Sequence, residues 1–197
     1  MKETQKMQSK DFITCGIFSA LSLVALMIAT VANITPYTSL LYTSLYALLN
    51  GTIFLLVCIK VPKSGAILVF SVVPFAFMAS RGWENMILAG SIAICALLSE
   101  LILKKNRNNS TRIAVAYMVY TTYISISGSF GMFVFPDVYC NNAIERGINP
   151  TIVEGIRGLL NYGTWAGMIA LTALASVGGI ALGRSLMKKH LHKAGVA

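Results

Sequence analysis

Residues 21–32, LSLVALMIATVA, decide the fold class of this chain. They are apolar or small on every side of the helix that they would form, and no charged residue occurs between positions 12 and 33. A helix that is apolar all round is buried in a large core or spans a membrane. The strands of a transmembrane β-barrel would instead alternate apolar and polar residues. The stretch therefore predicts a membrane-spanning helix.

The composition of the whole chain agrees with a membrane protein. Of its 197 residues, 56% are hydrophobic and 12% are charged, whereas a soluble domain carries about 45–50% apolar and about 25% charged residues. A soluble fold with so few charges would expose large apolar patches, and disorder requires low hydrophobicity. Nucleic acid is not an expected partner, because the basic residues are not gathered on a polar domain.

Cutting the chain at its charged residues leaves six apolar stretches. A bilayer core about 30 Å thick needs about 20 apolar residues per helix, and the third and fourth stretches are short. The sequence therefore predicts an all-α integral membrane protein, a six-transmembrane-helix bundle that forms a single domain over residues 1–197. An external loop, residues 135–159, contains a predicted short helix that starts at Pro150. The predicted spans are residues 12–33, 37–59, 65–80, 86–103, 111–134 and 160–184.

The basic residues indicate the orientation of the bundle. If the N-terminus is cytoplasmic, thirteen of the sixteen Lys and Arg residues lie inside, and only Arg81, Arg146 and Arg157 lie outside. The opposite orientation would reverse this bias. We therefore expect both termini in the cytoplasm, and we interpret the net charge of +9 as a topology signal.

Groups that carry catalysis, metal binding or ion coupling are scarce in the sequence. His190 and His192 lie in the C-terminal tail, and the four cysteines are too scattered for a metal cluster or a disulfide framework. Ion-driven carriers use carboxylates within their spans, whereas Glu100 lies near a cytoplasmic end, where an i,i+4 pair with Lys104 is the simplest interpretation. We expect no metal site, no intrinsic cofactor and no enzyme activity. Any transport must then be powered by another protein.

Polar and aromatic residues gather in the half of the chain that is predicted to face outside. Aromatic belts form at every bilayer interface, but apolar walls with a few polar anchors are also what a small-molecule pocket requires. The same half also contains Asn33, Thr35, Thr38, Glu84, Ser125, Ser127, Ser129, Phe135, Asp137, Tyr139, Asn141, Asn142 and Tyr162. The candidate substrate-binding residues are Tyr37, Tyr42, Arg81, Trp83, Asn85, Tyr123, Phe133, Arg157, Asn161 and Trp165.

Each of these candidates has a simpler structural interpretation. Tyr42 and Tyr123 suit packing in the core as well as a stacking wall for a planar ligand. Arg157 is placed to neutralise a carboxylate or phosphate of a ligand, but an ion pair with Glu154, one turn away, would occupy it.

Small residues four positions apart occur in the first and the last predicted span. Gly16 and Ala20 share one helix face, and so do Ala25 and Ala29, so that another helix can approach closely. Packing inside this bundle and docking of a partner subunit explain the spacing equally well. The last span repeats it at Ala175, Gly179 and Gly183.

Longer stretches of the sequence resemble a known family. They are KDFITCGIFSA at residues 10–20, KVPKSG at 60–65, Gly82-Trp83 followed by Gly90, and GGIALGRSLMKKHLHKAG at 178–195. Together with six short helices and cytoplasmic termini, they resemble the substrate-binding S component of energy-coupling factor (ECF) transporters. The chain is most similar to the Trep-Strep (MptD-type) family, over nearly its whole length.

The resemblance implies a mechanism. An S component in the bacterial cell membrane, surrounded by lipid, captures a micronutrient from outside, associates with a T subunit and two ATPase subunits, and topples to release the ligand inside. The family's Ala-x-x-x-Ala docking motif maps onto Gly16 and Ala20, with glycine in place of the first alanine, and Ala25 and Ala29 form the alternative register. ATP is expected on the separate ATPases, because this chain has no P-loop.

The transported ligand stays open at this point. Nickel and cobalt S components use an N-terminal histidine, which this chain lacks, so a metal ion is not expected. An outer half rich in Tyr and Met suits a planar, partly apolar, acidic molecule. We place a tetrapyrrole such as haem first, with Tyr or Met as iron ligands, and a flavin, pterin or other vitamin second. A structural or assembly membrane protein and a membrane enzyme are the alternative functions.

Overall fold

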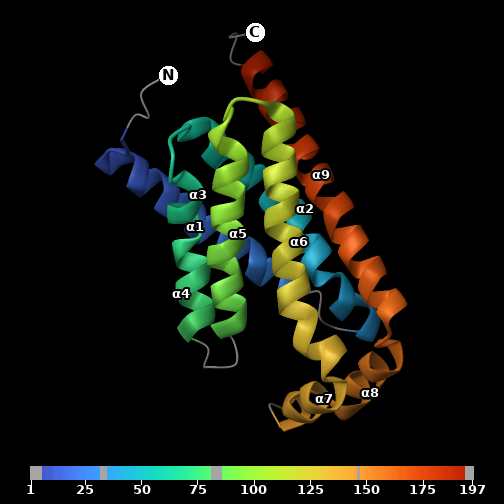
Figure 1. Cartoon of the computed structure of the whole chain (residues 1–197). Coiled ribbons are helices and arrows are strands. Elements are labelled where there is room, and N and C mark those ends of the chain that lie inside the picture. Colours follow the sequence, from blue (N-terminus) through green and yellow to red (C-terminus); the bar gives the residue numbers. More distant parts are fainter. Residues whose placement is uncertain (1–5, 32–34, 81–85, 146, 194–197) are drawn as a thin grey trace.

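The computed structural model describes residues 6–31, 35–80, 86–145 and 147–193. All regular secondary structure in these ranges is helical (Figure 1). Five helices, α1, α2, α5, α6 and α9, are long and apolar enough to cross a membrane, which confirms an all-α membrane fold. In chain order the helices are α1 (Ser9–Thr30), α2 (Pro36–Lys60), α3 (Ala66–Phe70), α4 (Val72–Ser80), α5 (Met86–Lys104), α6 (Ser110–Val134), α7 (Pro136–Glu145), α8 (Pro150–Leu159) and α9 (Tyr162–Lys193).

The predicted third span, residues 65–80, consists of two short helices, α3 and α4, that meet at Ser71. Pro74 has no backbone N–H, so it cannot donate to the carbonyl of Phe70 four residues earlier. The hydroxyl of Ser19 on α1 donates to that carbonyl instead. The apolar segment Ala66–Ser80 is shorter than the five membrane-length helices.

The predicted external loop, residues 135–159, is mostly helical. It contains α7 and α8, and α8 begins at Pro150, as the sequence predicts. The Asn149 side chain caps α8 by accepting a hydrogen bond from the Thr151 backbone N–H, at 2.9 Å. Figure 1 shows α7 and α8 at one end of the bundle, and the Ser9 end of α1 and the Lys193 end of α9 at the other. We call these the α7–α8 end and the terminal end.

Helices α2 and α9 form the most extensive contact in the bundle. A Cβ atom on Gly179 would lie 2.6 Å from the Leu48 carbonyl oxygen, and one on Gly51 would lie 2.5 Å from the Gly179 carbonyl carbon. A Cβ atom on Gly183 would lie 3.0 Å from the Cα atom of Thr52. The glycines of the last span therefore let two backbones touch inside this chain.

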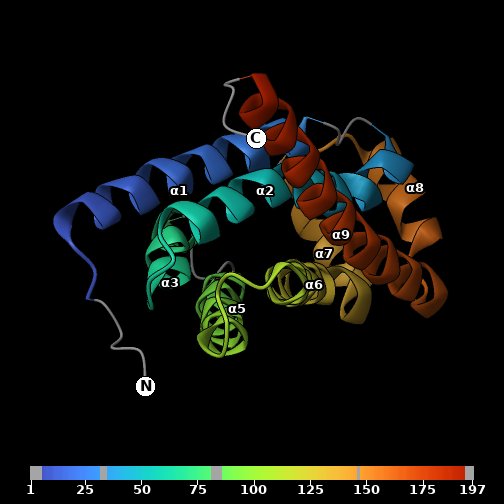
Figure 2. The ribbon, with the colours of Figure 1, turned by 90° about the horizontal axis from the view of Figure 1, so that it is seen from above.

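Helix α1 lies at the edge of the bundle. Figure 2 shows α5 and α6 almost along their axes, whereas α1 is strongly inclined to them. α1 packs on α2, α3 and α4 and has the smallest buried share of the five membrane-length helices. Its outward face is apolar, with Ile13, Ile17 and Val24 each more than half exposed.

Aromatic rings fill the centre of the bundle. The ring centroid of Phe54 lies 4.8 Å from that of Tyr117 and 5.7 Å from that of Tyr120. Tyr117 donates a hydrogen bond to the Ala47 carbonyl at 2.6 Å, and the hydroxyls of Tyr120 and Ser71 lie 3.1 Å apart. These two tyrosines of α6 are therefore core residues whose hydroxyls are satisfied inside the protein.

Two ion pairs of the described residues each connect a helix to an interhelical segment at the terminal end. Glu100 of α5 accepts a hydrogen bond from the Ile67 backbone N–H, at 2.8 Å, and pairs with Arg107. The sequence-based pairing of Glu100 with Lys104 is therefore wrong, because the turn after α5 brings Arg107 back and the start of α3 presents a free N–H. Asp11 and Lys63 form the second pair, at 2.7 Å.

Candidate ligand-binding site

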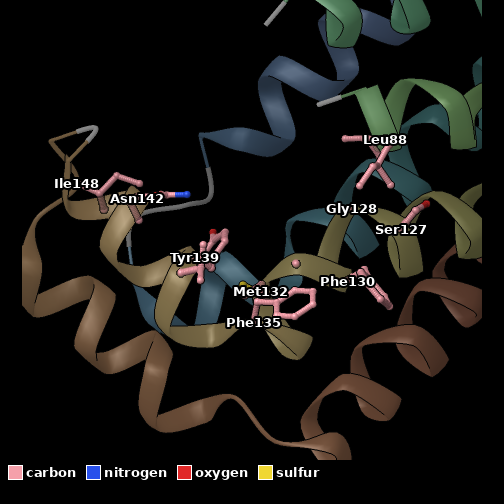
Figure 3. A pocket seen from close by; sticks show the side chains of 13 residues that line it. Leu88, Ser127, Gly128, Phe130, Met132, Phe135, Tyr139, Asn142 and Ile148 are labelled. Atoms are coloured by element: carbon pink, nitrogen blue, oxygen red, sulfur yellow. The ribbon is translucent and has the colours of Figure 1, made fainter. Parts of the chain in front are cut away.

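A pocket of about 370 Å³ lies at the α7–α8 end, between α5, α6 and α7 (Figure 3). Leu88 of α5 lies on one side of it and Asn142 and Ile148 on the other. None of the described residues that line the pocket carries a charge. They are Ile87, Leu88, Ser127, Gly128, Phe130, Gly131, Met132, Phe135, Val138, Tyr139, Asn142, Ala143 and Ile148.

Two glycines of α6 leave the helix backbone bare where it borders the pocket. A Cβ atom on Gly131 would meet nothing within 4 Å, and one on Gly128 would make an ordinary contact of 3.5 Å with Leu88. The rings of Phe130 and Phe135 meet edge to face beside them, with their centroids 6.4 Å apart. We call the exposed α6 backbone at Gly128 and Gly131 the pocket floor.

Tyr139 and Asn142 supply polar groups from α7. They lie three residues apart and so share a helix face. Within the described part of the chain, neither the Tyr139 hydroxyl nor the Asn142 amide makes a hydrogen bond, although both residues line the pocket. Partial burial raises the pKa of Tyr139 above its ordinary value, and a tyrosine phenol is already uncharged at neutral pH at that ordinary value.

Among the described candidate residues taken from the sequence, Tyr42 lies close to the pocket. Its hydroxyl lies 3.8 Å from the position of a Cβ atom on Gly128. Tyr123 is partly buried against the main core, and its carbonyl accepts a hydrogen bond from the pocket residue Ser127. Tyr37, at the start of α2, is 69% exposed. Arg81, Trp83 and Asn85 lie outside the described residues.

Phe133 and Trp165 belong to a core cluster with residues from α2, α6, α8 and α9. Their rings are stacked, with the centroids 5.5 Å apart and the planes 9° from parallel. The Trp165 indole N–H donates to the Ser129 hydroxyl at 2.8 Å. The structure thus brings these two candidates together, and neither lines the pocket, although Trp165 meets the lining residue Phe130 edge to face, with the centroids 6.4 Å apart.

Arg157 and Asn161 have local partners. Arg157 pairs with Asp137 at 2.7 Å, across the contact between α7 and α8. The sequence-based alternative, a pair with Glu154, is wrong because Asp137 begins the neighbouring helix. The Asn161 side chain accepts a hydrogen bond from the Thr164 backbone N–H, at 2.9 Å, and so caps the start of α9.

The two small-residue pairs of α1 lie in different environments. Ala25 and Ala29 are buried against Tyr46 of α2. Ala20 is exposed on the outward face, and a Cβ atom on Gly16 would meet nothing within 4 Å. Only the pair Gly16 and Ala20 is thus placed where a helix from another protein can reach it.

In the described part of the membrane-length helices, the carboxylates lie toward the helix ends at the terminal end of the bundle. Among the residues that the structure describes, the acidic residues of the membrane-length helices are Asp11 and Glu100, and both form ion pairs at the terminal end. In the described ranges, His, Cys, Asp and Glu side chains form no group of three or more that could hold a metal ion.

The pocket floor has only a weak signature in the sequence. Gly128 and Gly131 lie three residues apart in a stretch that also contains Ser125, Ser127 and Ser129, and the glycines of α9, Gly179 and Gly183, four residues apart, serve helix packing. The pocket exists because the neighbouring helices leave this part of α6 uncovered, and the packing of the helices is determined by the whole fold.

A family model described as "Hypothetical bacterial integral membrane protein (Trep_Strep)" matches residues 9–193. This range begins at the first residue of α1 and ends at the last residue of α9. No curated protein and no solved structure matches the chain.

Proposed function

The chain belongs to the Trep_Strep family of hypothetical bacterial integral membrane proteins, and from this premise we propose that it is the substrate-binding S subunit of an ECF-type importer. It lies in the bacterial cell membrane with six crossings and cytoplasmic termini. It captures a micronutrient, a vitamin or a tetrapyrrole such as haem, outside the cell. It delivers this cargo inward when docked on a T subunit with two ATPases, and it has no catalytic activity of its own.

The pocket at the α7–α8 end is the single observation that carries this proposal. In the proposed orientation that end faces outside, so a ligand from the medium can enter between α5, α6 and α7. Small-molecule sites are concave, mostly apolar and lined by a few polar groups. The lining has this character, with Tyr139 and Asn142 as unpartnered polar groups.

The distribution of charge supports the orientation. Among the described residues, most basic side chains lie at the terminal end, which the positive-inside tendency assigns to the cytoplasm. Figure 1 places the end of α4 and the start of α5 together at the α7–α8 end. The pair α3–α4 therefore leads from one end of the bundle to the other, which favours a sixth crossing.

The ion pairs of the structure support transport that is powered by separate ATPase subunits. Asp11 and Glu100 are neutralised by Lys63 and Arg107 at the terminal end. A carrier that couples transport to protons or sodium needs carboxylates along its pathway. We therefore assign the energy supply to separate ATPases.

The exposed pair Gly16 and Ala20 supports docking through α1. Small residues let a partner helix approach closely in a membrane, and the alternative pair, Ala25 and Ala29, is already covered by α2. The outward face of α1 is therefore the proposed contact with the T subunit.

Co-purification tests the docking assignment. Ala20→Trp should prevent recovery of the T subunit and the ATPases, because the indole would separate the two helices. Ala181→Trp, at an exposed position of α9, should leave recovery unchanged. Equal recovery with both variants would remove α1 from the interface.

Native mass spectrometry with absorbance measurement tests ligand capture. The purified chain should retain a small molecule, and Gly131→Leu should lose it, because the new side chain would enter the pocket. Gly167→Leu is the matched control, since its Cβ atom also meets nothing within 4 Å and lies outside the pocket. A chain that retains no ligand and recruits no ATPase would instead be a structural or assembly protein. Substrate turnover by the isolated chain would indicate an enzyme.

A further inference from the structure

The chemistry of the pocket lining restricts the charge of its ligand. Among the described residues that line the pocket, the polar side chains are Ser127, Tyr139 and Asn142, all of them neutral. The described ion pair nearest in sequence to the lining, Asp137 with Arg157, is internally neutralised and does not line the pocket. An ion that enters an apolar site without a counter-charge loses hydration that nothing replaces. The lining therefore favours an uncharged ligand.

The shape of the pocket restricts the size and form of the ligand. The floor at Gly128 and Gly131 presents helix backbone without side chains, and a flat ring can lie against such a surface. Phe130 and Phe135 border it and offer ring contacts. The volume of about 370 Å³ is near the lower end of the range of about 300–1,000 Å³ for ligand pockets, so a macrocycle is disfavoured.

The unpartnered groups of α7 define a polar side of the ligand. The Asn142 amide offers donors and an acceptor, and the Tyr139 hydroxyl offers one of each. A ligand edge with carbonyl, ring nitrogen or hydroxyl groups would pair with both side chains. Such pairing would satisfy the groups that the described chain leaves free.

We propose that this pocket binds an uncharged, water-soluble compound with a small flat ring, which lies on the floor at Gly128 and Gly131 and directs its polar edge to Tyr139 and Asn142. This inference rests on the proposed function and deepens it, because it favours a neutral ring vitamin over an anionic tetrapyrrole as the cargo.

Binding assays with probes of matched structure test the charge of the ligand. The full chain in phosphatidylcholine nanodiscs is titrated with riboflavin, pyridoxine and nicotinamide as uncharged probes, and with flavin mononucleotide and haemin as anionic probes. We expect at least one uncharged probe to bind saturably. If it is riboflavin, flavin mononucleotide, which adds only a phosphate, should bind more weakly by about tenfold or more, as an uncompensated charge predicts.

Variants of Asn142 give an independent measure of ligand charge. For an uncharged ligand, Asn142→Asp and Asn142→Lys should both weaken binding, each by about five- to tenfold, because each loses the amide hydrogen bonds. For an anionic ligand, the Lys variant should bind more tightly and the Asp variant more weakly. Opposite effects of the two variants would overturn the proposal.

Pocket-filling variants confirm that the measured binding occurs here. Gly131→Leu should weaken it by at least about tenfold, as expected for a blocked pocket, while Gly167→Leu should leave it unchanged. The proposal is overturned if none of the uncharged probes shows binding that Gly131→Leu weakens. It is also overturned if haemin or flavin mononucleotide shows such binding more tightly than the uncharged probes. A phospholipid found in the pocket by native mass spectrometry would overturn it as well. Recovery of the ATPases, tested with Ala20→Trp, does not depend on the ligand. Failure of the proposed function is therefore distinguished from failure of the proposal about the ligand.

Discussion

The contact between α2 and α9 makes a strong prediction about a single methyl group. In Gly179→Ala the new Cβ atom would lie 2.6 Å from the Leu48 carbonyl oxygen and 2.8 Å from that of Ala47. Both neighbours are backbone atoms of a helix, so neither can rotate away. A carbon–oxygen contact is ordinary from 3.4 Å, so α9 must withdraw by about 0.8 Å to reach van der Waals separation.

The cost of this withdrawal follows from the packing. Overfilling a close-packed site costs about 1–3 kcal/mol, and the neighbouring contact at Gly183 would also open. Alanine is a better helix former than glycine by about 1 kcal/mol, which offsets part of the loss. We therefore expect Gly179→Ala to lower the free energy of unfolding by about 1–2 kcal/mol.

The adjacent glycine provides a matched control. A Cβ atom on Gly178 would lie 3.5 Å from the Leu48 Cδ1 atom, an ordinary contact. Gly178→Ala should therefore gain helix propensity without a clash and raise stability by up to about 1 kcal/mol. Both variants are compared with the wild type by denaturant unfolding in detergent micelles. If Gly179→Ala proves as stable as Gly178→Ala, the close approach of α2 and α9 is refuted.

Three further substitutions are measured by the same unfolding assay. Glu100→Gln should lower the free energy of unfolding by about 3 kcal/mol, because Arg107, which is largely buried, then has no counter-charge. A smaller loss of stability than that of Arg157→Ala would contradict the pairing of Glu100 with Arg107. Arg157→Ala should cost less than about 1 kcal/mol, since the side chain is 48% exposed and water screens its ion pair, and a larger loss would show that α7 and α8 depend on it. Trp165→Phe should cost about 1 kcal/mol through the lost hydrogen bond to Ser129, so an unchanged stability would argue against that bond.

The helices could be predicted from the sequence because their cause is local. The length of an apolar stretch between charged residues is enough to show whether it can span a bilayer. The predicted span 86–103, for example, differs from α5 by one residue. The predicted last span, residues 160–184, ends too early, since α9 continues to Lys193. Its final turns are basic, and a cut at charges removes them although they remain helical.

The use of each small-residue pair could not be predicted in the same way. Gly179 and Ala20 have the same kind of spacing, yet one touches α2 and the other is exposed. The difference lies in which helix comes alongside, and that depends on the whole arrangement. Spacing indicates that a close approach is possible, but it does not identify the partner.

Several candidate binding residues instead hold the fold together. Asn161 could have been recognised as a cap, because an asparagine immediately before a helix accepts from its free N–H groups. The stack of Phe133 on Trp165 joins residues far apart in sequence, and no local pattern indicates it. Polar and aromatic residues near a helix end therefore suit a binding site and an interhelical contact alike.

The division of the third span at Ser71 has a consequence for the lipid around the protein. Ala66–Ser80 has a length of about 22 Å at 1.5 Å per residue, against a hydrocarbon core of about 30 Å. As a crossing in the proposed topology, this segment requires the adjacent leaflets to thin or the flanking side chains to extend toward the headgroups. Hydrophobic mismatch costs fractions of a kcal/mol per Å, so short-chain lipids should gather along α4, and the thickness of the host bilayer should affect how readily this protein tilts within it.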